Sequence, residues 1–168
     1  MWTARRILKD LADADRRRRI AAAFWKHADA SSKAMAAVQL ARSLHFRDET
    51  IRKMPADKKA ELLASRAALP ELEQTLEAAL MHYHTHEQNE MLGAFLDAWR
   101  IPHVNGSIET DDYTPPTAEQ VRDAVRELRG RFDARDVAIY LATLGLLMGE
   151  PWDGAAWPAI DDAMPTSA

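Results

Sequence analysis

Apolar residues recur at helical spacing through most of the chain, most clearly in the stretch 69–100. Two sets repeat there every three or four positions, and each would line one face of a helix. The first set is Leu72, Leu76, Ala79, Leu80 and Tyr83, and the second is Met91, Ala94, Phe95, Ala98 and Trp99. Between them the run HTHEQNE, residues 84–90, has no aliphatic side chain and no Phe, Tyr or Trp. The pattern predicts helix on both sides of a wholly polar run.

Two structures account for this polar run. If the helix breaks, Thr85 and Gln88 form a capping box that starts a second helix, and the run is a solvated corner. If the helix continues over 70–99, it places His86, Glu87 and Glu90 on or beside the buried face. Ionisable groups there must be paired, hydrogen-bonded or bound to a metal. Because no Gly or Pro interrupts the run, the continuous helix is favoured.

Capping residues and prolines divide the rest of the chain into further helices. In the first part of the chain the predicted helices are 4–12 after Thr3, a helix to about 28 after Asp13 or Asp15, and a helix capped by Ser31 and Ser32 that ends near Phe46. A short turn over 48–53 and a helix over 56–67 after Pro55 lead to the central helix after Pro70. Two more helices follow, 118–130 after a Thr117/Gln120 capping box and 134–148. The last of these is apolar on nearly every side, as in the centre of a bundle or an oligomer interface. The fold class expected is all-α, a bundle of about six or seven helices around a long central helix.

Residues 101–117, IPHVNGSIETDDYTPPT, form the one long segment without a helical pattern. Asn105-Gly106 is a strong turn signal that would close a small hairpin between His103–Val104 and Ser107–Ile108. Irregular loops of this length are uncommon unless they are functional or packed down. If the protein has a ligand site, this loop is expected to lie over the polar run.

Length and composition favour one compact domain over 1–168. A chain of 168 residues buries about 70% of its unfolded surface around a single core. There is no cysteine, which excludes disulfides and thiolate metal sites. No apolar leader opens the sequence, and the most apolar run, 137–149, is too short to span a bilayer. We therefore expect a cytoplasmic protein without a membrane segment, whose last few residues are disordered.

The net charge of −4 conceals a division between a basic N-terminal half, 1–66, and an acidic C-terminal half, 67–168. The first half holds 16 Lys and Arg against 8 Asp and Glu, and the second holds 6 against 18. Such a division suits either a polyanion ligand or mutual attraction within a monomer or across a dimer. Attraction is favoured because the acidic half would repel nucleic acid.

Arg16–Arg19 encircle a whole helical turn and form a collar of charge, not a groove-reading stripe.

The residues best suited to chemistry are the histidines and glutamates around the polar run. On a helix His82, His86 and Glu90 are four apart and share a face, giving three ligands for a divalent metal. Further ligands would come from Glu87, His84 and His103. Other candidates are His27, His45, Asp111 and Asp112. The HExxH spacing of zinc peptidases is absent. The alternative interpretation is a solvated or hydrogen-bonded histidine cluster at a helix junction.

No other catalytic signature is present. The chain has no glycine-rich phosphate loop, no GxSxG elbow and no cysteine nucleophile, and whether it is an enzyme stays open. The first functional hypothesis is a protein-interaction or self-associating module, expected to be a homo-oligomer. The second is a metal-binding protein or metal-dependent enzyme using His82, His86 and Glu90. The third is a nucleic-acid binder through Arg16–Arg19, which the charge division disfavours. The substrate, the partner and the process cannot be derived from the sequence.

Overall fold

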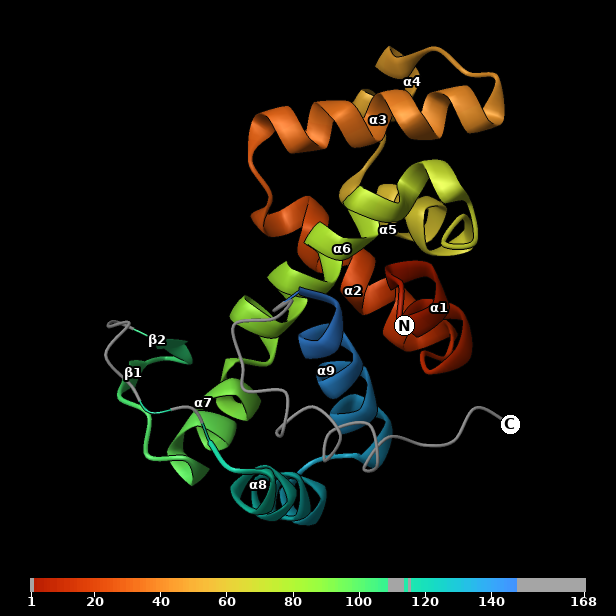
Figure 1. Ribbon diagram of the computed structural model, residues 1–168. Coiled ribbons are helices and arrows are strands. Elements are labelled where there is room, and N and C mark those ends of the chain that lie inside the picture. The colour runs from red at the N-terminus through yellow and green to blue at the C-terminus, as the bar shows by residue number, and fades with distance from the viewer. Residues whose placement is uncertain (1, 109–113, 115, 148–168) are drawn as a thin grey trace. The chain divides into compact units, whose positions relative to one another are not determined.

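A computed structural model of the chain describes residues 2–108, 114 and 116–147. The all-α prediction is confirmed, because these residues form nine α-helices and a hairpin of two short strands. The chain divides into two compact units, Thr3–Glu87 and Met1–Trp2 with Gln88–Ala168. We call them the N-terminal and C-terminal units (Figure 1). The boundary falls inside the polar run and not at the charge division near residue 66, and the single-domain prediction stays a prediction.

The N-terminal unit contains six α-helices in chain order. They are α1 (Ala4–Asp10), α2 (Ala14–His27), α3 (Ala30–Leu44), α4 (Asp48–Lys53), α5 (Ala56–Ser65) and α6 (Glu73–His82), with a 3₁₀ turn at Pro70–Leu72 and a π-helical turn at Tyr83–Glu87. The side chain of Thr3 caps α1 as predicted, and of the two candidates for α2, Asp13 and Asp15, Asp13 is the cap. The prediction that serines cap α3 is wrong. Asp29 is the cap and accepts hydrogen bonds from both the amide and the hydroxyl of Ser32.

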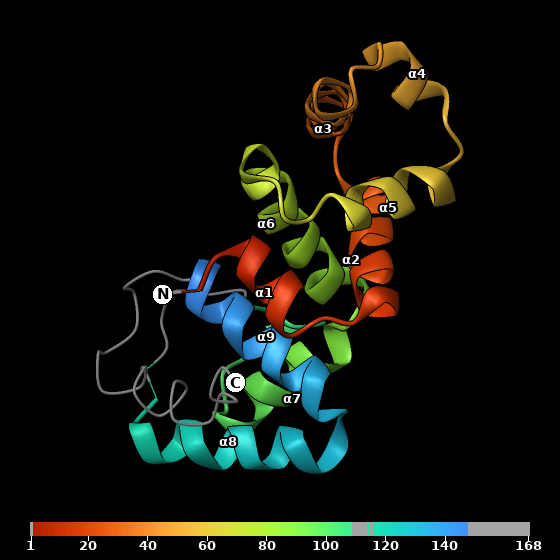
Figure 2. The same ribbon diagram turned by 90° about the vertical axis from the view of Figure 1, so that its right-hand side faces the viewer.

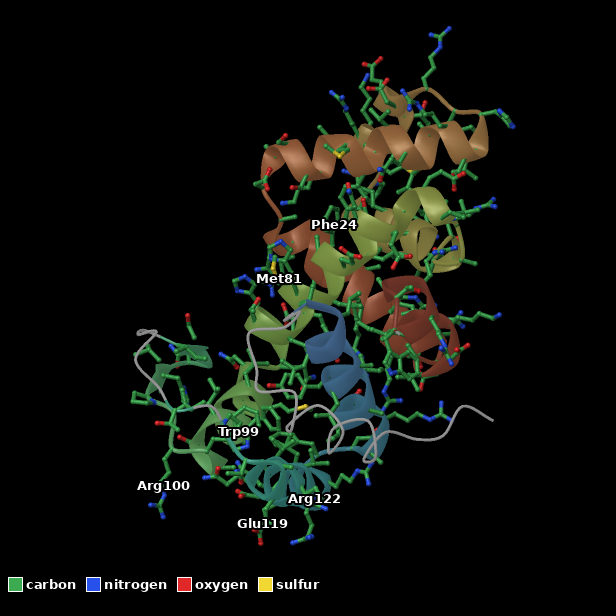
Figure 3. The ribbon with its side chains drawn as sticks, in the orientation of Figure 1. Phe24, Met81, Trp99, Arg100, Glu119 and Arg122 are labelled. Carbon is green, nitrogen blue, oxygen red and sulfur yellow. The ribbon has the colours of Figure 1, made fainter. Side chains whose placement is uncertain are left out.

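Helix α2 lies at the centre of the N-terminal unit and packs against α5 and α6, while α3 packs against α4 (Figures 1 and 2). Phe24, labelled on α2 in Figure 3, is 1% exposed. The other fully buried large side chains of this unit are Ile7, Leu8, Ile20, Leu40, Ile51, Leu63, Leu72, Leu76 and Leu80. Glu73 ties α6 to the start of α1 by accepting hydrogen bonds from the Ala4 amide and the Arg5 guanidinium.

The prediction of one continuous helix over 70–99 is wrong. Helix α6 widens into the π-helical turn Tyr83–Glu87 and ends at Gln88, whose φ of −126° and ψ of 27° are not helical. Thr85 does not start the second helix either, since α7 begins after Gln88 as its N-cap and the Thr85 hydroxyl donates back to the Met81 carbonyl. A run without apolar side chains offers no face whose burial would hold a straight helix together. The helix therefore stops where the apolar stripe stops.

The C-terminal unit consists of α7 (Asn89–Ala98), the hairpin, α8 (Ala118–Arg131) and α9 (Ala134–Leu147). Its core joins three aromatic rings. Phe95 lies 4.2 Å from Trp99 and 5.4 Å from Tyr140 between ring centroids. The predicted capping box of α8 is present in both directions between Thr117 and Gln120. Figure 3 shows Trp99 within this unit, whereas Arg100, Glu119 and Arg122 project away from the ribbon.

The predicted hairpin is confirmed at residue level. Strands β1 (His103–Val104) and β2 (Ser107–Ile108) are antiparallel, with His103 opposite Ile108. Both turn residues have positive φ, 51° at Asn105 and 83° at Gly106, as a two-residue hairpin requires. The turn lies close to α7, since a Cβ at Gly106 would be 2.6 Å from Leu92 Cβ. A second close approach joins the His103 ring to Gly93.

Several predictions fall outside the described residues. These are the 109–113 part of the loop with Asp111 and Asp112, its position over the polar run, the end of the predicted helix 134–148, and the disorder predicted for the last few residues. Within the described part, no helix has both the length and the hydropathy that crossing a bilayer requires.

Candidate functional site: a basic groove and a histidine stack

A groove of about 340 Å³ opens on the N-terminal unit among α2, α3, α4 and α5. Its lining consists of Trp25, Ala30, Lys33, Ala34, Ala37, Arg52, Ala56 and Lys59. The alanines of α3 are spaced so that they share one face of the helix. Because their side chains are only methyl groups, the helices leave a hollow instead of filling it. The volume lies within the range of sites that take one or two side chains or a small ligand.

The charge of this basic groove is entirely positive, because its lining includes three cations and no carboxylate. The Lys59 ammonium lies 5.4 Å from the centroid of the Trp25 ring, within the range of a cation–π contact. The Lys33 ammonium is 3.4 Å from the Lys26 carbonyl, and Arg52 pairs with Asp48 at 3.0 Å. The Arg52–Asp48 pair is about half exposed, so it is worth only about 0.2–1 kcal/mol. A stronger acceptor in the groove could displace it.

Trp25 forms the aromatic wall of the groove. It is 8% exposed, and its ring meets Phe24 edge to face at 5.2 Å. The indole Nε1 is buried and makes no hydrogen bond within the part of the chain that the structure describes. A buried donor without an acceptor costs about 1–3 kcal/mol. A ligand that supplied an acceptor here would remove that cost.

A stack of three imidazoles lies where α2 and α6 end, and we call it the histidine stack. His27 is the last residue of α2, His82 is the last residue of α6, and His86 lies in the π-helical turn. The rings of His27 and His86 are 4.1 Å apart and 13° from parallel, while those of His82 and His86 are 5.7 Å apart at 20°. The predicted proximity of His82 and His86 is therefore present, and His27 joins them from a different helix.

Glu87 ties this stack to the end of α2. One of its carboxylate oxygens accepts from His27 Nε2 at 2.7 Å and from Lys26 Nζ at 2.9 Å. The His27 hydrogen bond, followed by that of Lys26, lowers the pKa of the Glu87 carboxyl. Burial, reinforced by the neighbouring imidazoles of His86 and His27, lowers the pKa of His82. The stack thus favours the ionised form of the Glu87 carboxyl and the neutral form of His82.

The stack does not have the geometry of a metal centre. Ligand atoms of a bound ion must converge on one point about 2.0–2.2 Å away, whereas stacked rings present their faces to each other. Among the residues that the structure describes, no group of three or more His, Asp or Glu is arranged to hold an ion. The metal hypothesis stays a prediction.

The remaining predicted ligands lie in different surroundings. Glu90 belongs to the C-terminal unit, where it is 3.7 Å from Arg131. His84 is buried, and burial lowers its pKa to about 3. His103 accepts from the Gly106 amide through Nδ1, so Nε2 carries the proton that faces Asp97 at 3.2 Å. His45 ends α3 in the left-handed conformation. Within the N-terminal unit the structure therefore brings together His82, His86 and Glu87, whereas Glu90 and His103 belong to the C-terminal unit.

The arginine collar also has local partners. Arg16 pairs with Asp13, and Arg18 is 3.5 Å from Asp15. These arginines occupy the first turns of α2, whereas Trp25 of the basic groove is in its last turn. The collar is therefore not part of the groove.

A second hollow of about 370 Å³ on the same unit is less suited to an anion. It is lined by Gln39, Arg42, Ser43, Arg66, Leu69, Glu71 and Leu72. The Glu71 carboxylate offsets the two arginines, and Gln39 and Ser43 already hydrogen-bond to Thr75 and the Leu40 carbonyl. The basic groove lacks such compensation.

Sequence reasoning did not find the residues of the basic groove. Trp25 stands next to Phe24 among the apolar positions of a predicted helix, which is typical of a core residue, and Lys33, Arg52 and Lys59 resemble ordinary surface cations. The one available signal was the set of alanines along α3 beside an excess of positive charge.

Comparison with known proteins gives no match to a family model, to a curated protein or to a solved structure. Sequence and geometry are therefore the guides to what this site binds.

Proposed function

We propose that the N-terminal unit is a protein-recognition module that binds an acidic segment of a partner in the basic groove. The observation that carries this proposal is a concave site lined by Lys33, Arg52, Lys59 and Trp25 without any carboxylate. Carboxylates of a bound segment would pair with the three cations, and apolar atoms would contact the alanines and the indole. Anchoring by aromatic and arginine side chains is typical of protein interfaces.

A protein segment fits this groove better than nucleic acid does. Single-stranded nucleic acid binds largely by stacking its bases on exposed aromatic rings. Trp25 is only 8% exposed, and Lys59 lies over its ring, so no open platform for a base exists. Residues 88–168 hold 6 Lys and Arg against 14 Asp and Glu, which opposes a long polyanion but not a short acidic segment.

The test is binding of a fluorescein-labelled peptide of alternating glutamate and tryptophan, measured by fluorescence anisotropy. The groove variant carries Arg52→Glu and Lys59→Glu. Its matched control carries Lys53→Glu and Lys58→Glu, which change the net charge equally but lie outside the lining. Arg52 and Lys53 each pair with an acid one turn earlier, so the two variants perturb α4 alike.

We expect the groove variant to weaken peptide binding about tenfold or more, because a like charge replaces each attractive one. The control should stay within about twofold. A peptide of alternating glutamine and tryptophan should bind poorly to all three proteins. Equal losses in the two variants would refute the proposal, because only overall charge would then matter.

A further inference from the structure

We infer that the acidic segment recognised by the basic groove is residues 148–168 of a second copy of this chain, so that the protein associates with itself. This inference rests on the proposed function of the groove and names its partner. Charge and side-chain chemistry point to this segment, and the experiment below distinguishes it from an acidic segment of another protein.

The sequence of 148–168, MGEPWDGAAWPAIDDAMPTSA, has the composition that the groove requires. It holds the four acids Glu150, Asp153, Asp161 and Asp162, and no Lys or Arg occurs anywhere after Arg135. It also contains Trp152 and Trp157, aromatic residues of the kind that anchor protein interfaces. The same chain thus contains both the basic groove and an acidic, tryptophan-containing segment of opposite charge.

Charge complementarity is consistent with two copies meeting through these parts. The N-terminal unit holds 16 Lys and Arg against 12 Asp and Glu, whereas residues 88–168 hold 6 against 14. Lys33, Arg52 and Lys59, the cations of the groove, contribute to the excess of positive charge in the N-terminal unit. If each copy offers its 148–168 segment to the other, both grooves are filled and the assembly closes. Opposite charges would also steer the encounter, and salt would weaken it.

The experiment is sedimentation equilibrium of the full chain across a range of concentrations. The wild type should associate, and the groove variant Arg52→Glu/Lys59→Glu should associate about tenfold more weakly or worse. The segment variant Glu150→Gln/Asp161→Asn/Asp162→Asn should show the same loss with the groove intact.

Matched controls separate this effect from net charge. The variant Glu119→Gln/Asp123→Asn/Glu127→Gln removes the same charge from α8 as the segment variant does from 148–168. All three control residues are exposed. This variant should associate like the wild type. So should the Lys53→Glu/Lys58→Glu control of the groove.

A charge swap guards against loss of folding as the explanation. The segment is reversed as Glu150→Lys/Asp161→Lys/Asp162→Lys in one protein, and the groove is reversed in the other as above. Each protein alone then presents like charges and should be monomeric. An equimolar mixture should associate, because each groove now meets a segment of opposite sign. A pair of misfolded proteins would not regain association on mixing.

The outcomes distinguish this inference from the proposed function. A monomeric wild type, or association that is indifferent to both the groove and the segment variants, overturns the inference. Binding of the labelled glutamate–tryptophan peptide to the segment variant is then measured as before. Groove-dependent peptide binding would leave the proposed function standing with a different partner. Failure of peptide binding as well would end both.

Discussion

Burial of His84 should make the protein lose stability as the pH falls from 7 to 5. The side chain is 4% exposed, and burial lowers its pKa from 6.5 to about 3. The unfolded chain keeps an ordinary histidine pKa near 6.5. Between these two pKa values the unfolded state therefore binds more protons than the folded state, so the free energy of unfolding decreases as protons are added.

The size of the effect follows from the two pKa values. At pH 7 an imidazole with a pKa of about 6.5 is mostly neutral in the unfolded chain, and the penalty is only about 0.2 kcal/mol. At pH 5 it is almost fully protonated in the unfolded chain but still neutral in the fold, and the penalty is about 2 kcal/mol. Below pH 3 the loss would level off at about 5 kcal/mol, since each pKa unit is worth about 1.4 kcal/mol.

Urea unfolding followed by circular dichroism at pH 7 and pH 5 measures this loss. The variant His84→Phe keeps an aromatic ring beside Tyr83, which the histidine meets edge to face at 5.4 Å, but it cannot titrate. The wild type should lose about 2 kcal/mol more than the variant over this interval. Other groups cancel in the comparison because both proteins contain them. Identical pH dependence of the two proteins would refute the assignment of His84 as a buried neutral imidazole.

Three further predictions concern single sites. Gly106→Ala should destabilise the C-terminal unit by about 3 kcal/mol, because its φ is positive and the new Cβ would clash with Leu92. Gly130→Ala, whose Cβ would meet nothing within 4 Å, should instead stabilise α8 by up to about 1 kcal/mol. Changes of the same sign in the free energy of unfolding by urea would contradict this pair of predictions. Thr117→Ala should cost about 1 kcal/mol by removing the capping box, and thermal unfolding that does not change would show that α8 begins elsewhere. The metal hypothesis predicts that, when zinc is titrated into chelator-treated protein in a calorimeter, one zinc ion binds per chain, and that His86→Ala abolishes this binding. If the wild type shows no heat of zinc binding, the hypothesis is wrong.

The predictable parts of the fold were those set by local chemistry. A capping side chain and the amide it binds are three residues apart, so Thr3, Asp13 and Thr117 marked the starts of their helices correctly. The Asn105-Gly106 turn gave the hairpin register because few residue pairs accept two positive φ angles. At α3 the same logic pointed to Ser31 and Ser32 and was wrong, because Asp29 is the cap and accepts from both the amide and the hydroxyl of Ser32.

Prediction failed where the outcome depended on partners distant in sequence. The polar run has no glycine or proline, so helix propensity alone allowed a continuous helix through it. Propensity is a weak force compared with burial of an apolar face, and the run offers no such face. The π-helical turn lets His86 stack on His27 and Glu87 bond to the end of α2. The sequence of residues 84–90 alone does not indicate that these residues of α2 are its partners.

The same reasoning explains why the most chemical stretch of sequence and the best binding site are different places. Histidines and glutamates concentrate at 82–90, where the apolar stripe is interrupted, and Glu87 there bonds to His27 and Lys26 at the end of α2. The basic groove arises from the opposite cause, since α3 supplies alanines where larger side chains would have filled the space. A hollow made by small residues leaves no chemical motif in the sequence. Its three cations come from α3, α4 and α5 and line one groove with Trp25 of α2 only in the folded unit. Recognition at this surface is therefore a property of the fold rather than of any one segment.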